Sequence, residues 1–179
     1  MTVQELIEKD NTFTEADFIA KVDNTYIMYL SAIMTGNLPR VDHKIGDELY
    51  KKAQQKLDLL NKNNQRQMYD ELNVKTSNIL SIDETEDKYI IKVNLISRYM
   101  DYIVDKNTNE FISGNNTSRV EIQNILTFEK NKNAKDFKNI KKCPTCGASI
   151  DFNNNGQCPF CKNIFNTEDY DWVLISIEN

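Results

Sequence analysis

Two short cysteine motifs constrain the C-terminal part of this chain more than any other feature. The sequences Cys143-Pro144-Thr145-Cys146 and Cys158-Pro159-Phe160-Cys161 are separated by eleven residues. Two thiolates three positions apart in a tight turn can bind one ion, and two such turns complete a tetrahedral set of soft ligands. We therefore predict a zinc ribbon, in which one structural zinc ion is bound by Cys143, Cys146, Cys158 and Cys161.

Alternative uses of the four cysteines are disulfide bonds, free buried thiols or an iron site. Disulfides need an oxidising compartment, and residues 1–11 have neither the basic start nor the apolar run of an export signal. Iron competes with zinc because rubredoxin-type sites use similar knuckles. Four protein sulfur ligands leave no position open for water, so the ion is expected to fold the segment and not to catalyse hydrolysis.

The first part of the chain has the apolar periodicity of helices. Thr12 and Glu15 have capping-box spacing, and Gly36 and Pro39 are expected to end the helix that follows. A second helix is indicated by a stripe at steps of three or four residues, namely Ile45, Leu49, Ala53, Leu57 and Leu60. Residues 65–72 are interpreted as a further short helix.

From Asn73 onward the apolar period changes to two, which is typical of strands. The three predicted inner faces are Val74, Thr76, Asn78, Leu80 and Ile82, then Ile91, Val93, Leu95 and Tyr99, then Val120, Ile122, Leu126 and Phe128. An apolar run from Trp172 to Ile177 indicates a last strand. We therefore predict an α+β domain over residues 12–131 and 168–179, with the ribbon inserted over residues 140–167.

The charge distribution limits the class of partner. A net charge of -5 argues against a nucleic-acid-binding protein, because binding phosphate needs a positive field. Residues 132–142 hold five lysines against one acid, and the simplest interpretation is a solvated linker. The alternatives are a contact for anionic lipid or an acidic partner, or a nucleic-acid contact. From Cys143 to the end, one lysine faces five acids, which favours a protein contact or a purely stabilising role.

A catalytic centre is not indicated by any motif. The single histidine, His43, would need an oriented partner and a cleft to act as a base, and a surface or capping role is the simpler interpretation. Six tyrosines could line a pocket between helix and sheet: Tyr26, Tyr29, Tyr50, Tyr69, Tyr99 and Tyr102. Core residues with a hydroxyl at the rim are the alternative. The candidate binding residues are Tyr26, Tyr29, Tyr99 and Tyr102.

Several segments resemble one family. They are Leu38-Pro39, Ser77 to Leu80, Arg98 to Tyr102, and Thr117 to Phe128 with the late tryptophan strand. Together they resemble the C-terminal domain of the mitochondrial inner-membrane translocase subunit forty-four, which has bacterial relatives, some with zinc ribbons. The resemblance implies a fold similar to nuclear transport factor two, with helices packed into the concave face of a curved antiparallel sheet to form a cone.

The resemblance also implies a non-catalytic binding or scaffold role in membrane-associated protein transport or assembly. The mitochondrial protein tethers an import motor and touches anionic lipid, so a protein partner and a peripheral contact with an anionic membrane are expected. The alternative is a small-ligand-binding or enzymatic cone protein with Tyr29, Tyr99 and His43 around one cavity. No stretch approaches the length that crosses a bilayer, so we expect a soluble, cytoplasmic protein, peripheral to a membrane at most.

Overall fold

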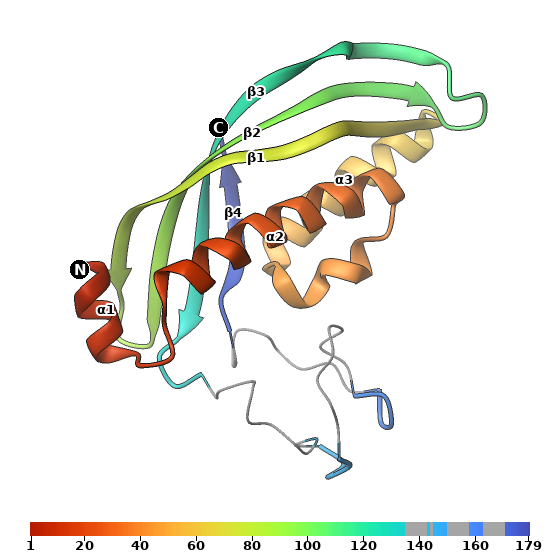
Figure 1. The fold of residues 1–179 in the computed structure, drawn as a ribbon. Helices are drawn as coiled ribbons and strands as arrows, with labels where there is room; N and C mark the ends of the chain where they lie inside the picture. Colours follow the sequence, from red (N-terminus) through yellow and green to blue (C-terminus); the bar gives the residue numbers. More distant parts are fainter. Residues whose placement is uncertain (135–142, 144, 150–157, 163–170) are drawn as a thin grey trace.

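A curved antiparallel sheet with helices on its concave side makes up the computed structural model (Figure 1). The structure describes residues 1–134, 143, 145–149, 158–162 and 171–179. The sheet order is β1-β2-β3-β4, and its strands are β1 (Gln65–Glu84), β2 (Lys88–Asp105), β3 (Phe111–Asn131) and β4 (Val173–Glu178). Among the strands that the structure describes, β1 and β4 are the two edges of the sheet. The predicted α+β class and the curved antiparallel sheet are confirmed.

The first helix, α1 (Val3–Lys9), was not predicted from the sequence. Its N-terminus is a capping box in which Thr2 and Glu5 each bond to the other's backbone N–H. Leu6 is its fully buried side chain and joins the core of the sheet. Its apolar residues, Val3, Leu6 and Ile7, span a single turn, which is too short for a repeating stripe, so this helix is held by its cap and by tertiary packing.

The main helix, α2 (Glu15–Thr35), begins two residues later than the predicted box. Thr14 is its N-cap and accepts a hydrogen bond from the Asp17 N–H at 3.2 Å. It ends at Gly36, whose φ of 69° places it in the left-handed region that glycine favours. The predicted C-terminus at Gly36 is confirmed.

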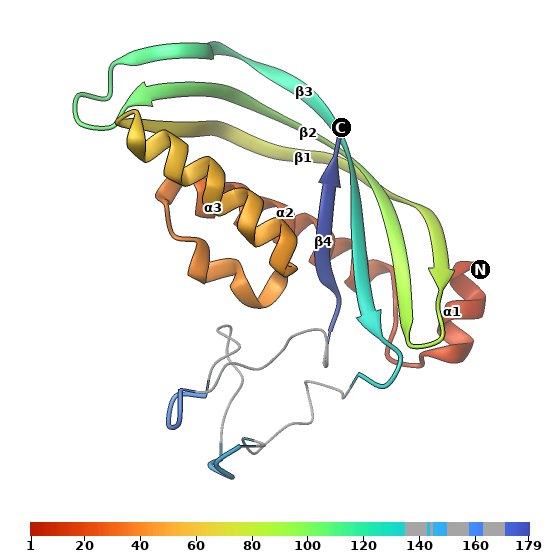
Figure 2. The ribbon, with the colours of Figure 1, turned by 180° about the vertical axis from the view of Figure 1, so that it is seen from behind.

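Between the two long helices the chain forms a 3₁₀ segment, η1 (Leu38–Lys44), with a proline in its first turn. The next helix, α3 (Asp47–Lys62), starts after Gly46, which is its N-cap. The predicted stripe began at Ile45 and placed Gly46 inside the helix, whereas Gly46 precedes its first residue. Its backbone N–H donates to the carbonyl oxygen of Leu174 on β4 at 2.8 Å. This bond joins the start of α3 to the last strand, and the two elements lie side by side in Figure 2.

Two predictions for the first strand were wrong. Residues 65–72 form the start of β1 and not a helix, because their backbone pairs with β2 in a continuous ladder. Tertiary pairing of this kind overrides weak local propensity. The expected face ending at Leu80 and Ile82 was also wrong, since Leu80 is 55% exposed while Ile82 is buried. Three register shifts along β1 are the reason, because each one interrupts the alternation of faces.

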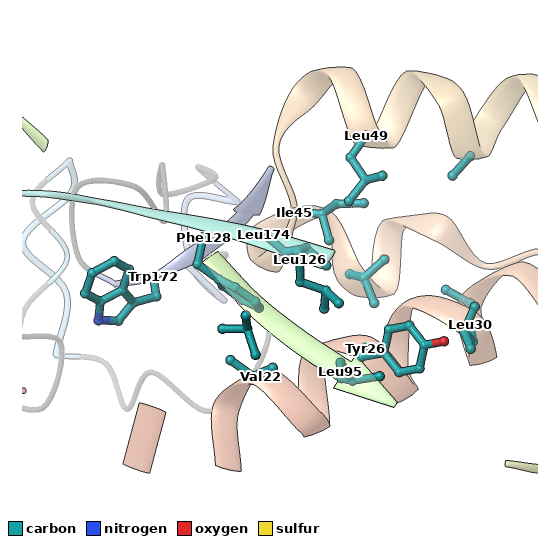
Figure 3. Close-up of a cluster of buried hydrophobic side chains, with 14 of the residues drawn as sticks. Val22, Tyr26, Leu30, Ile45, Leu49, Leu95, Leu126, Phe128, Trp172 and Leu174 are labelled. Atoms are coloured by element: carbon teal, nitrogen blue, oxygen red, sulfur yellow. The ribbon is translucent and has the colours of Figure 1, made fainter. Parts of the chain in front are cut away.

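The core lies between α2, α3 and the concave face of the sheet (Figure 3). The predicted inner face of β2 is confirmed, since Ile91, Val93 and Leu95 are fully buried. They pack with side chains from other elements, including Val22, Tyr26, Leu126, Phe128 and Leu174. Burial of each large apolar side chain contributes roughly 1.5–3 kcal/mol. No helix in the described ranges is both long enough and apolar enough to span a bilayer.

Candidate metal centre and tyrosine-lined cavity

The four cysteines predicted to bind a metal lie together. Their Sγ atoms all fall within 4.8 Å of one another. The distance from Cys143 to Cys161 is 3.8 Å, and that from Cys146 to Cys158 is also 3.8 Å. Both distances are far longer than the roughly 2.05 Å of a disulfide, so the four residues are free thiols.

Each cysteine pair lies in a tight turn whose backbone N–H groups point at the Sγ atom of the first cysteine. The N–H groups of Thr145 and Cys146 donate to Cys143 Sγ at 3.4 and 3.5 Å, and the N–H of Cys161 donates to Cys158 Sγ at 3.5 Å. The residue after each second cysteine has positive φ, 72° at Gly147 and 61° at Lys162. The two knuckles therefore share one conformation, although only the first has glycine at this position.

The turns also favour the ionised form of the sulfur. Burial opposes ionisation of Cys143, but the backbone N–H groups of Cys146 and Thr145 outweigh it and lower the pKa of Cys143 to about 6. Burial likewise opposes ionisation of Cys158, while backbone N–H groups led by that of Cys161 lower its pKa. The thiolate is the form of cysteine that binds metal ions.

The sulfur positions fit one tetrahedral ion. A metal–sulfur bond of about 2.3 Å places the corners of a regular tetrahedron about 3.8 Å apart. The Cys143–Cys161 and Cys146–Cys158 separations have this value. With four thiols supplied by the chain, the set is closed. Such a site folds the chain around it and leaves no position for a substrate.

A second feature is a cavity of about 330 Å³ between α2, α3 and the sheet. Of the predicted binding tyrosines, Tyr26, Tyr29 and Tyr99 line it, together with Tyr69. Tyr102 lies elsewhere on the sheet, where its hydroxyl donates to Asp70 and its ring packs on Phe111. The structure thus gathers three of the four candidates in one place.

Polar groups meet at the hydroxyl of Tyr26, one of the tyrosines that line this cavity. The Tyr26 hydroxyl lies 2.9 Å from Ser97 Oγ and 3.2 Å from Asn124 Oδ1. The side-chain amide of Asn124 donates to Asn179 Oδ1 at 2.8 Å. Ser97 and Asn124 were missed from the sequence. Their signal was a polar residue at an inner-face position of an otherwise apolar strand, next to Leu95 in one case and Leu126 in the other.

Two lysines of α3 line the outer part of the cavity. Lys56 Nζ donates to the Tyr69 hydroxyl at 2.7 Å and lies 5.4 Å from the centre of the Tyr69 ring. Burial lowers the pKa of Lys56, with Asp101 opposing. Burial also raises the pKa of Tyr69 and of Tyr99 well above the ordinary value, so both phenols stay neutral hydrogen-bond donors. Lys52 is the second lysine that lines this space.

His43 does not join the tyrosines. It lies in η1, outside the lining of the cavity, and makes no hydrogen bond with any other residue in the described part of the chain. Burial lowers its pKa, Lys44 lowers it further and Asp42 opposes. A general base needs an oriented hydrogen-bond partner. The predicted grouping of Tyr29, Tyr99 and His43 around one cavity was therefore wrong for the histidine.

The lysine-rich segment is described only at its start. Lys132 lies 3.2 Å from a Glu84 oxygen and 5.5 Å from the centre of the Tyr89 ring. The other four lysines, at positions 135, 138, 141 and 142, lie outside the described residues. The contacts of Lys132 therefore fix the beginning of the segment against the sheet, and the predicted roles of the segment stay predictions.

Comparison with known proteins adds one finding. The family model of the Tim44-like domain matches residues 1–139. This range includes every helix named above and β1 to β3, and it ends before the first cysteine. A search of the curated proteins finds no match.

Proposed function

The chain belongs to the family of Tim44-like domains, and we propose that it is a binding module for a protein partner in membrane-associated transport or assembly. At the level of the family, this domain points to non-catalytic, membrane-associated work in protein transport. The match over residues 1–139 is the observation that carries the proposal. The position of His43 supports it, because the single histidine of the chain lies outside the lining of the cavity.

For the metal centre we propose zinc in a structural role. Zinc prefers four thiolates in a closed tetrahedral set, and the sulfur separations fit its bond length. The proposed division of the chain follows the cysteines. Residues 140–167 form the inserted ribbon, and residues 12–131 and 168–179 belong to the α+β domain, to which α1 adds Leu6.

The test of the proposed function uses site-specific crosslinking in cells. A photo-reactive residue replaces Phe160, the exposed side chain between the second pair of cysteines, or Phe111, the exposed side chain at the far end of the sheet. The proposal expects one protein captured from at least one position, which then binds the purified chain in titration. The same two preparations kept without irradiation are the control for non-specific capture.

The same preparations are then sedimented with vesicles. Binding to phosphatidylglycerol vesicles and not to phosphatidylcholine vesicles supports a peripheral site on an anionic membrane. The proposal is overturned if neither Phe position captures a protein that binds in titration. Reproducible turnover of a substrate, lost in a Tyr99→Phe variant, would also overturn it.

A second candidate function is favoured by the tyrosine-lined cavity. Tyr26 and Asn124 line it and are hydrogen-bonded to each other, and its volume of about 330 Å³ falls at the lower end of the range of ligand pockets. A filled, purely apolar interior would have excluded a ligand carrier. The observed interior is neither filled nor purely apolar. We therefore propose reversible binding of a small ligand as the second function.

A further inference from the structure

We infer that the tyrosine-lined cavity binds a small amphipathic anion, a free carboxylate with a short hydrocarbon tail. This inference rests on the second candidate function and names its ligand class. Two independent features of the cavity carry it. One is the charge of the side chains that line it, and the other is the presence of both polar and apolar side chains in the lining.

The charge of the lining has one sign. Lys52 and Lys56 line the cavity, and its lining includes no aspartate or glutamate. Neither lysine forms an ion pair with a carboxylate among the residues that the structure describes. Asp101 is near enough to act on Lys56, but its Oδ1 accepts a hydrogen bond from Gln67 at 2.7 Å, outside the cavity lining. An entering carboxylate would therefore meet two side-chain ammonium groups and no side-chain carboxylate in the lining.

The ammonium of Lys56 is already positioned. Its bond to the Tyr69 hydroxyl and its place over the Tyr69 ring hold it against the cavity wall. The neutral Tyr69 and Tyr99 rings pack edge to face with centroids 5.3 Å apart, and both residues line the cavity. A carboxylate can accept hydrogen bonds from an ammonium and from phenols, and such charge-assisted bonds are roughly twice as strong as neutral ones.

The lining also contains aliphatic side chains. They are Leu30 and Ile33 of α2, Leu49 and Ala53 of α3, and Ile177 of β4. A hydrocarbon tail placed against these side chains loses contact with water, which contributes roughly 0.8 kcal/mol per buried methylene. A cation would be repelled by the two lysines, and a neutral alcohol would gain the apolar contact without the charge-assisted bonds. The ligand that uses both the lysines and the aliphatic side chains is an amphipathic anion.

The experiment compares three probes of equal chain length: octanoate, octan-1-ol and octylammonium. Each is titrated into the full chain by calorimetry, and the methyl NMR signals of Ile33 and Ile177 report whether it enters the cavity. The variant carries Lys52→Gln together with Lys56→Gln. The matched control is Lys51→Gln on the same helix, because Lys51 pairs with Glu48 at 3.0 Å and does not line the cavity.

We expect octanoate to bind the original chain and the Lys51→Gln control equally and to shift both methyl signals. We expect at least about a tenfold loss of affinity in the double variant, since two charge-assisted contacts are removed. Octan-1-ol should bind more weakly than octanoate, and octylammonium should not bind. Thermal unfolding of both variants near the original temperature shows that the loss does not come from misfolding.

Four results would overturn the inference. If octan-1-ol binds as tightly as octanoate, or if the double variant binds octanoate unchanged, the cavity takes apolar ligands and the second candidate function survives without the anion. If none of the three probes binds, that candidate function falls as well, while the role as a protein-binding module is untouched. If binding to phosphatidylglycerol vesicles is lost in the double variant but free octanoate does not bind, the lysines serve a lipid head group and the free-ligand inference is wrong.

Discussion

The ammonium of Lys130 lies 2.6 Å from Oδ2 of Asp10, and this ion pair joins the C-terminal end of α1 to β3. Both partners are largely buried, with side chains 11% and 12% exposed. Lys130 also donates to Thr12 Oγ1 at 3.2 Å, so its charge is held by two oxygens. Although α1 is one of the shortest helices described, the chain after it is thus anchored to the sheet.

The first prediction concerns this pair. Asp10→Asn should lower the free energy of unfolding by about 2–4 kcal/mol, because it leaves the Lys130 charge buried without its partner. Urea denaturation measures the change. Glu48→Gln is the control, since its exposed pair with Lys51 is expected to change stability by less than about 0.5 kcal/mol. Equal effects of the two substitutions would show that the Asp10 pair does not stabilise the fold.

The pH dependence of the same variant is a second prediction. Burial raises the pKa of Asp10, but the bonds to Lys130 and Thr12 outweigh it and leave the pKa below its usual value. A group with a lowered pKa in the folded state stabilises the fold above its unfolded pKa of about 3.9 and loses that effect as pH falls further. The stability gap between the original chain and Asp10→Asn should therefore be constant near neutrality and shrink below about pH 4. A gap that stays constant down to pH 2 would contradict this.

The alternating residues of β2 and the spacing of the cysteines were enough to predict the central strand and the gathering of four thiols. Their patterns are local, so the sequence carries them directly. The course of β1 could not be predicted, because its register shifts depend on pairing with β2. Helix α1 was missed since its anchors, Leu6 and Asp10, act through contacts with residues far away in the chain.

The cavity was predicted only in part for a related reason. Tyr26, Tyr29 and Tyr99 were chosen by residue type, and three elements bring them together. Lys52 and Lys56 were not chosen, because on a helical wheel they lie beside the apolar stripe of α3 and resemble ordinary solvated lysines. Lys52 and Lys56 line the cavity only because α3 packs beside α2 and the sheet. This packing depends on contacts between distant segments, so no local sequence pattern predicts it.

The third prediction tests the buried hydroxyl of Tyr26. Tyr26→Phe should lower the free energy of unfolding by about 1–2 kcal/mol, because Ser97 and Asn124 lose a hydrogen-bond partner in the core. Tyr29→Phe is the matched control, since its hydroxyl makes no hydrogen bond in the described part of the chain. Denaturant titration of both variants is the measurement. A loss in Tyr29→Phe as large as in Tyr26→Phe would mean that burial, and not the bond, sets the effect.

The fourth prediction concerns Gly114 in β3, where φ is 99°. A Cβ at this position would lie 2.6 Å from Tyr102 Cα and against the Asp101 carbonyl oxygen. Gly114→Ala should therefore destabilise the fold by about 3 kcal/mol, through steric overlap added to backbone strain. Gly36→Ala also has positive φ but open space around it, and it should cost only about 1 kcal/mol. Thermal unfolding measures the stability of both variants. Similar losses of stability would show that the backbone near Gly114 moves to accommodate the added methyl group.

The fifth prediction concerns the metal. Mass spectrometry of the folded chain should give one zinc per chain, and cobalt substitution should show the absorption of thiolate ligands. Cys146→Ser should lose the metal and unfold the ribbon while Trp172, packed against Phe18 with centroids 5.1 Å apart, keeps its buried fluorescence. If the folded chain contains no metal, the proposed site is overturned. Loss of the Trp172 signal together with the metal would show that the ribbon is integral to the sheet.

The short strand β4 pairs with β3 only after the chain has travelled through the whole cysteine segment. Closing a loop has an entropic cost that grows with the logarithm of its length, by about 0.6 kcal/mol for each doubling. A metal that clips Cys143 to Cys161 removes less than half of this loop, so it lowers the closure cost by less than that amount. The ion thus gives the returning strand little help from chain entropy. Evolution could lengthen, shorten or exchange the segment at this point with almost no penalty to the sheet beside it.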